Sequence, residues 1–92
     1  SRLRELLATG CAFVLYESPY RIVKLLADIA DIEYERNVVI GREMTKLHEE
    51  IVGGTAKEVY EDFSSRTKIL GEFAVFVSGN KKTQQIENFS DN

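Results

Sequence analysis

Two short segments of the sequence hold most of the side chains whose types and spacing could do chemistry. Glu17–Arg21 brings a carboxylate, a hydroxyl and a guanidinium together directly after an apolar run. Arg42–Glu50 mixes acidic and basic groups and contains His48, the single histidine. Such groups can move protons, hold anions or stabilise developing charge. Each segment also has a plain structural interpretation, as a helix cap with a surface ion pair or as a solvated hairpin end, and the residues alone leave both open.

The elements that must position these segments are two strands and a helix. The apolar run Cys11–Tyr16 predicts a buried strand that leads into the first segment. Ser18 and Pro19 predict the start of a helix over Tyr20–Ala30, as an N-cap and a first-turn proline. A β-branched run from Asn37 to about Arg42 predicts a second strand leading into the second segment. We therefore expect both segments to project from the same edge of one sheet.

The remaining pattern completes an α/β (α+β) fold. The sequence predicts a helix over Arg2–Ala8 that stops at Gly10, and a short third strand over Glu50–Gly53. Thr55 and Glu58 match a capping box that starts another helix. Glu72–Ser78 is apolar on both faces, which predicts a central strand buried on both sides. The resulting order β-α-β-β-α-β, preceded by a short helix, is typical of ferredoxin-like folds. We expect one domain over residues 1–80 and a polar tail over 81–92.

Composition excludes several classes of protein. The net charge of −3 and pI near 5.2 argue against a free-standing nucleic-acid-binding domain, which usually shows a basic face. The single cysteine, Cys11, favours the cytoplasm, and its apolar neighbours predict a buried thiol. With one Cys and one His, no structural zinc site is expected. No apolar run approaches the roughly 20 residues that span a bilayer, so no membrane is expected.

Four motifs, taken together and in chain order, resemble the ribosomal RNA small subunit methyltransferase I family of the tetrapyrrole methylase superfamily. They are Leu15–Arg21 (LYESPYR), Gly41–Glu50 (GREMTKLHEE), Gly54-Thr55 and Gly71–Phe73 (GEF). The resemblance implies a bacterial enzyme that transfers a methyl group from S-adenosylmethionine to the 2′-hydroxyl of a cytidine in 16S ribosomal RNA. It also implies a preceding N-terminal domain with most of the cofactor pocket, a cleft between the two domains, and a homodimer.

The resemblance also implies roles for residues of this chain. Glu17, Met44 and the Gly54-Thr55-Ala56 turn would approach the cofactor. Ser18, Arg21 and Thr45 would contact the RNA substrate. Because a ribose hydroxyl is a weak acid that needs a nearby base or cation, we further hypothesise that Lys46 and Arg42 face the substrate while Glu50 orients Lys46.

The chain departs from the family pattern at three positions. It has Tyr20 where the family commonly has His, Gly41 where Ala is common, and Gly53 where Arg is common. The last departure removes one cation that would face RNA. Two alternatives stay open: a methyltransferase of the same superfamily that acts on a tetrapyrrole or another small molecule, and a non-catalytic ferredoxin-like ligand-binding module. An upstream glycine-rich α/β domain would favour the enzyme.

Overall fold

The computed structural model describes residues 2–45 and 48–80, except for the side chains of 43–45 and 48. Its helices and strands follow the predicted order. They are α1 (Arg2–Ala8), β1 (Phe13–Glu17), α2 (Ile22–Glu33), β2 (Asn37–Thr45), β3 (His48–Thr55), α3 (Ala56–Ser64) and β4 (Glu72–Val77). No helix in this part of the chain is long and apolar enough to cross a membrane.

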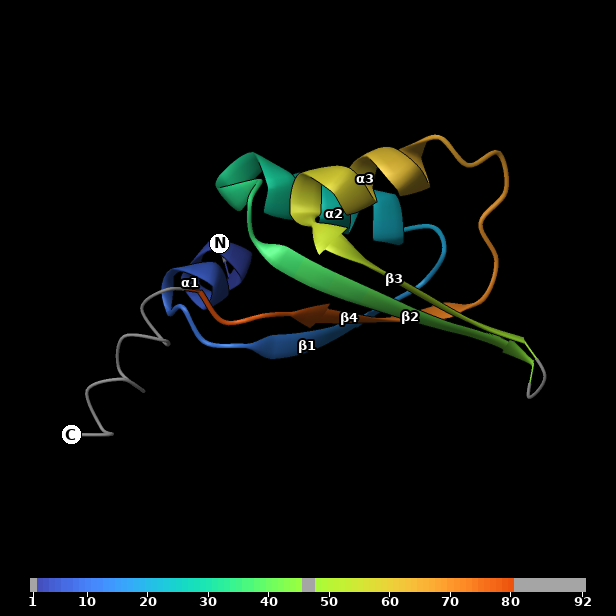
Figure 1. Cartoon of the computed structure of the whole chain (residues 1–92), viewed down its shortest axis with the longest axis horizontal. Coiled ribbons are helices and arrows are strands. Elements are labelled where there is room, and N and C mark those ends of the chain that lie inside the picture. The colour runs from blue at the N-terminus through green and yellow to red at the C-terminus, as the bar shows by residue number, and fades with distance from the viewer. Residues whose placement is uncertain (1, 46–47, 81–92) are drawn as a thin grey trace.

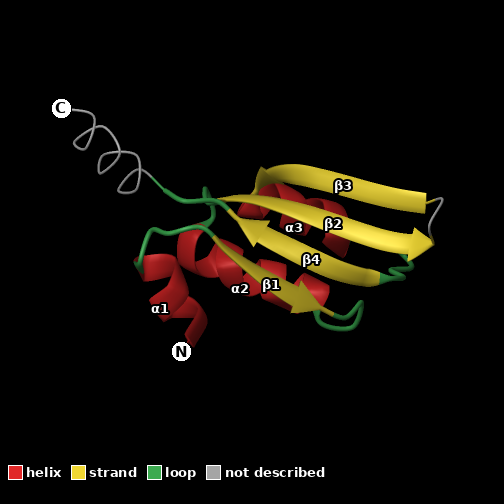
Figure 2. Ribbon diagram, turned by 90° about the horizontal axis from the view of Figure 1, so that it is seen from below, coloured by secondary structure: helices red, strands yellow, loops and turns green. Residues whose placement is uncertain are grey.

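The four strands form one antiparallel sheet in the order β1-β4-β2-β3. β2 and β3 are joined as a hairpin, and β4 lies between β1 and β2 (Figure 2). Each strand–helix–strand connection therefore skips one strand, which is the split βαβ arrangement. The predicted α+β, ferredoxin-like arrangement is confirmed.

Both long helices cover the same face of the sheet (Figure 1). Strand side chains that point toward α2 and α3 are buried and form the core with the apolar faces of the helices. Phe63 of α3 meets Phe73 of β4 edge to face, with ring centroids 5.6 Å apart. The buried apolar residues are Leu7, Ile22, Leu26, Ile29, Val38, Ile40, Ala56, Val59, Phe63, Phe73, Val75 and Val77.

The opposite side of the sheet, called the open face here, is covered by no helix in the described chain (Figure 2). It carries exposed apolar side chains from all four strands: Val14, Tyr16, Val39, Ile51 and Phe76. The prediction that β4 is buried on both sides is therefore wrong. Phe73, Val75 and Val77 are buried, whereas Phe76 is 55% exposed, because the two helices pack on one side only.

The helix starts agree with the sequence for α3 and differ for α2. Thr55 accepts a hydrogen bond from the Glu58 amide, and the Glu58 carboxylate accepts one from the Thr55 amide, so the capping box is confirmed. The predicted start of α2 at Ser18-Pro19 is wrong. The Ser18 carbonyl instead accepts from the amides of Arg21 and Ile22, which makes a turn, and the helix begins only at Ile22.

A buried arginine, Arg36, forms hydrogen bonds to segments near both ends of the described chain. Arg36 is 2% exposed and donates to the carbonyls of Leu7, Cys11 and Ser78 at 3.1, 3.1 and 2.6 Å. Its Nη1 also pairs with Glu33 at 3.1 Å. The thiol of Cys11 is exposed, contrary to the prediction, because Cys11 lies in the connection between α1 and β1 rather than in the strand.

Candidate functional site

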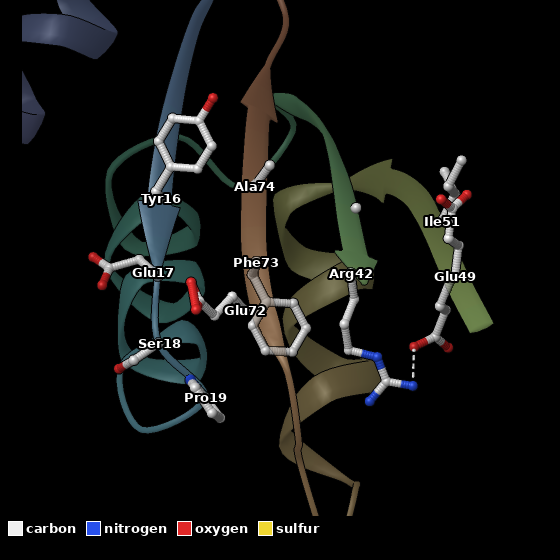
Figure 3. Close-up of a pocket in the computed structure, with 12 residues that line it drawn as sticks. Tyr16, Glu17, Ser18, Pro19, Arg42, Glu49, Ile51, Glu72, Phe73 and Ala74 are labelled. Carbon is white, nitrogen blue, oxygen red and sulfur yellow. Dashed lines mark ion pairs between the residues drawn. The ribbon is translucent and has the colours of Figure 1, made fainter. Parts of the chain in front are cut away.

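A cleft of about 900 Å³ opens at the end of the sheet where β1 finishes and β4 begins. Its lining comes from all four strands and from the turn after β1 (Figure 3). The two polar segments predicted to share one edge of the sheet do meet there. The lining residues are Tyr16, Glu17, Ser18, Pro19, Gly41, Arg42, Glu49, Glu50, Ile51, Glu72, Phe73 and Ala74.

Strand register explains how the charged residues of this cleft come together. Glu17 is opposite Phe73, Phe73 is opposite Arg42, and Arg42 is opposite Glu50. These four residues form one row across the sheet, and their side chains point to the helix-covered face, as the buried Phe73 does, because side chains alternate along each strand. Residues that are far apart in the sequence are thus neighbours in one line.

Arg42 makes two polar contacts at the cleft through its guanidinium. Its Nη2 lies 3.0 Å from Glu50 Oε1, and its Nη1 donates to the Leu70 carbonyl at 3.1 Å. Its Nε is buried and has no hydrogen-bond partner in the described structure. The predicted Arg42 is therefore part of the site, and it is already paired with a carboxylate.

Glu50 is bound by two arginines rather than one cation. Besides Arg42, it accepts two hydrogen bonds from Arg66, Nη1 to Oε1 at 3.0 Å and Nη2 to Oε2 at 3.1 Å. Hydrogen bonding by Arg66, with the positive charges of Arg66 and Arg42, holds the pKa of Glu50 below its ordinary value although partial burial opposes the shift. Glu50 is thus an ionised bridge between two cations.

Arg66 is the member of this cluster that the sequence did not reveal. It lies just after α3, where its guanidinium stacks 4.1 Å over the Phe63 ring and its Nε pairs with Asp62 at 3.1 Å. Hydrogen bonds to Glu50 and Asp62 raise the pKa of Arg66. The i,i+4 spacing of Asp62 and Arg66 is visible in the sequence. The contact with Glu50, 16 residues away, follows only from the fold.

The first polar segment contributes mainly one carboxylate to the cleft. Glu17 and Ser18 both line it, whereas Arg21 points largely to solvent and pairs loosely with Glu17, Nε to Oε1 at 3.6 Å. Tyr20 is almost fully exposed and is absent from the lining. The structure therefore brings Glu17 and Ser18 to the site and leaves Arg21 beside it.

Three predicted residues fall wholly or partly outside the described part of the chain. Met44 and Thr45 belong to β2, and Thr45 is opposite His48, but their side chains lie outside the described part. Lys46 lies outside the described residues altogether. Their predicted roles remain predictions.

The Gly54-Thr55-Ala56 turn lies at the other end of the sheet. Thr55 is opposite Asn37, five residues before Arg42 on β2, which at about 3.4 Å per residue is roughly 17 Å from the cleft. A side chain at Gly54 would place its Cβ 3.0 Å from the Glu58 carboxylate that closes the capping box. The structure thus accounts for this turn by helix capping and does not bring it to Glu17.

A shallow slot crosses the open-face side of the cleft. Tyr16 is opposite Ala74, Ala74 is opposite Gly41, and Gly41 is opposite Ile51. Two small residues thus form a floor between Tyr16 and Ile51, which are 80% and 75% exposed, and a Cβ at Gly41 would meet no atom within 4 Å. Four carboxylates and one cation line the whole cleft in the described residues, so a positively charged or apolar ligand fits it better than an anion.

Comparison with known proteins gives consistent relatives. The chain is 44% identical to the ribosomal RNA small subunit methyltransferase I of Borrelia garinii over 84% of its own length, and 42% identical to that of Thermotoga maritima over 84%. It is 43% identical to that of a Hydrogenobaculum species over 73% of its length. No protein-family model matches the chain.

These matches cover 29 to 35% of the relatives' lengths, so the chain spans about a third of the relatives that it matches. The matched region is their C-terminal part. The same name recurs among further relatives at 30 to 38% identity. The chain therefore belongs to the ribosomal RNA small subunit methyltransferase I family, as a counterpart of the C-terminal part of its members.

Proposed function

We propose that this chain is the C-terminal domain of an S-adenosylmethionine-dependent methyltransferase that modifies the ribose 2′-hydroxyl of a cytidine in 16S ribosomal RNA, in the bacterial cytoplasm. The single observation that carries the proposal is the high identity, over most of the chain, to relatives named as ribosomal RNA methyltransferases. The meeting of Glu17 and Ser18 with Arg42 and Glu50 in one cleft supports it.

The cleft has the chemistry to hold part of the proposed cofactor. Tyr16 and Ile51 offer exposed apolar surface beside a floor of small residues, which suits a planar heterocycle. Glu72, which shares the open face with Ala74, adds negative charge, which suits a positively charged sulfonium. When bound, S-adenosylmethionine would supply the methyl group. The larger part of its pocket belongs, in this proposal, to a preceding N-terminal domain that forms the other wall of the cleft.

The residues of this chain would act mainly by positioning and by electrostatics. Methyl transfer to an oxygen is an in-line displacement, so holding the acceptor hydroxyl in line provides much of the acceleration. Arg42, fixed by Glu50, is placed to orient the substrate at the mouth of the cleft. Lys46 would stabilise the developing alkoxide or take part in deprotonating the hydroxyl. Because Glu50 is occupied by Arg42 and Arg66, it is available to orient Lys46 only as part of that cluster.

Contacts with RNA phosphates must come largely from elsewhere. The described lining of the cleft holds four carboxylates, and the whole sequence has a net charge of −3. Phosphate binding by proteins depends on Lys and Arg. We therefore assign the bulk of RNA binding to the proposed N-terminal domain and to the second subunit of a homodimer, with Lys46, Thr45, Ser18 and Arg21 contributing near the reacting ribose.

Substitution of Lys46 tests the proposed chemistry. In the full-length protein that contains this chain, Lys46→Ala should lower methyl transfer to small ribosomal subunits by roughly 10²-fold or more, with S-adenosylmethionine affinity nearly unchanged. Lys57→Ala is the matched control, because Lys57 is exposed on α3 at the other end of the sheet. Near-normal turnover of the Lys46 variant would remove Lys46 from the mechanism, and absence of transfer by the unmodified protein would overturn the proposed function.

A second test concerns the two-wall cleft. The 92-residue chain alone should show no S-adenosylmethionine binding by calorimetry, because it provides only one wall. The full-length protein should bind the cofactor in the same assay. Binding of comparable strength by the chain alone would contradict the assignment of most of the pocket to an N-terminal domain.

A further inference from the structure

We infer that Arg66 is a positioning residue that fixes the Glu50–Arg42 pair at the cleft. The inference deepens the proposed function, because it names a residue that controls the charged pair at that site. Arg66 is absent from the cleft lining and belongs to the connection between α3 and β4. It would act through the carboxylate that it binds and would not touch the substrate.

Arg66 binds Glu50 through more hydrogen bonds than Arg42 does. Its two Nη atoms bind both carboxylate oxygens, at 3.0 and 3.1 Å, in a parallel fork that sets the plane of the carboxylate. Arg42 reaches only Oε1, at 3.0 Å. Without the fork, Glu50 could rotate and no longer keep Oε1 in front of Arg42 Nη2.

Arg66 is itself held in place on two sides. Phe63 of α3 lies under the guanidinium at 4.1 Å, and Asp62 binds its Nε at 3.1 Å and its Nη2 at 3.4 Å. Its side chain is 20% exposed, which limits the water that can compete for these bonds. Phe63 and Asp62 on α3 thus position the Arg66 guanidinium, and that guanidinium orients the Glu50 carboxylate on β3.

The same connection also contacts Arg42 directly. The Leu70 carbonyl accepts from Arg42 Nη1 at 3.1 Å, so the segment between α3 and β4 holds the pair from both ends, Glu50 through Arg66 and Arg42 through Leu70. Arg42 Nε is buried and unpartnered in the described structure, so Arg42 has few other contacts that would keep its orientation. The orientation of the Arg42 guanidinium at the cleft therefore depends on its contacts with Glu50 and the Leu70 carbonyl.

The first experiment uses the 92-residue chain and NMR. In Arg66→Met, the pKa of the Glu50 carboxyl should rise toward 4.5, and rotation about the Nε–Cζ bond of Arg42 should become faster. Arg66→Lys keeps the charge but not the fork, so it should give an intermediate Glu50 pKa and still free Arg42. Asp62→Asn loosens the hold on Arg66 and should speed Arg42 rotation to a smaller extent. The Glu50 pKa is not used as a readout for this variant, because the Asp62 charge itself raises that pKa.

Arg21→Met is the matched control, because Arg21 is exposed and pairs only loosely with Glu17. Backbone spectra of each variant establish that the fold is retained. If Arg66→Met unfolds, Arg66→Lys and Asp62→Asn carry the test. An unchanged Glu50 pKa together with unchanged Arg42 rotation in the folded variants would overturn the inference.

The second experiment uses the full-length protein and methyl transfer. Arg66→Lys should lower kcat about tenfold or more with KM for the cofactor unchanged, because misplacement of a positioning group acts on the reacting geometry. If the unmodified protein transfers no methyl group, the proposed function fails while the NMR result still decides the role of Arg66. A normal kcat for an Arg66→Lys variant whose Arg42 is freed would overturn the functional part of the inference.

Discussion

Replacing Arg36 by Met should be the most damaging single change to this domain outside its apolar core. Arg36 is 2% exposed and binds three carbonyls from three different segments: the end of α1, the connection before β1, and the residue after β4. Met fills a similar volume but donates no hydrogen bond. The Leu7 carbonyl would keep its hydrogen bond from the Gly10 amide, at 3.2 Å, whereas the Cys11 and Ser78 carbonyls would lose the Arg36 donor. The Glu33 carboxylate is partly exposed and can turn to water.

The magnitude follows from the number and kind of bonds lost. A hydrogen bond to a charged group contributes about 1.5–3 kcal/mol, and the three are coupled because they share one guanidinium. Because the bonds share one guanidinium and the Leu7 carbonyl keeps another donor, we take the total as about 3–5 kcal/mol, the lower part of their sum. A domain of this size is stable by about 5–14 kcal/mol. The variant should therefore lose a large part of its stability, and its Tm should fall by at least about 12 °C.

Urea unfolding followed by circular dichroism, with thermal melts as a second readout, measures the loss. Arg36→Lys should lose about 2 kcal/mol, because an ammonium keeps the charge but cannot reach all three carbonyls. Arg21→Met is the control and should stay within about 0.5 kcal/mol, since its ion pair is exposed. A loss below about 1 kcal/mol for Arg36→Met would refute the view that this cation joins the two ends of the domain.

Three further predictions concern other parts of the structure. Because the pKa of Glu50 is lowered in the folded chain, its contribution to stability is present above its ordinary pKa of 4.5 and is lost as pH falls toward the folded value. Glu50→Gln should flatten the acid limb of a stability-versus-pH curve from urea titrations, and an unchanged limb would argue against the Arg66–Glu50 fork. Thr55→Ala should lower the free energy of unfolding by about 1 kcal/mol through loss of the capping box, and a loss confined to a few tenths would mean that the cap is not formed in solution. Gly41→Ala should raise it by about 0.5–1 kcal/mol, because Gly41 has no positive φ and a Cβ there meets open space; a lower free energy of unfolding would contradict the open floor of the slot.

The sequence predicted the elements whose signals are local. The periodicity of α2, the capping box before α3 and the stop at Gly10 depend on neighbouring residues, and the structure has each of them. The predicted α2 start is wrong because a Ser-Pro pair also fits a turn, and here the Ser18 carbonyl closes that turn with the amides of Arg21 and Ile22. The strand β4 was predicted as fully buried because its sequence is apolar throughout, and a sequence does not tell how many layers will cover a sheet.

For the site, the sequence predicted which segments meet but not which atoms pair. Glu17 and Arg42 come together because their strands end at the same edge, which the element order implies. The partner assigned to Glu50 was a near neighbour, Lys46, whereas the described partners are Arg42 and Arg66. Long-range pairing of this kind depends on the register of β3 and on where the segment after α3 returns. Neither the register of β3 nor the path of that segment can be predicted from neighbouring residues in the sequence.

The one-sided sheet has a consequence for how the sequence can change. Side chains alternate along each strand, so each strand carries two separate sets of constraints. Val75 and Val77 must fit α2 and α3, while Phe76 between them meets no helix in the described chain. Substitutions at open-face positions can therefore alter what this surface binds with little effect on folding. In this domain, recognition and stability can evolve on alternate residues of the same strands.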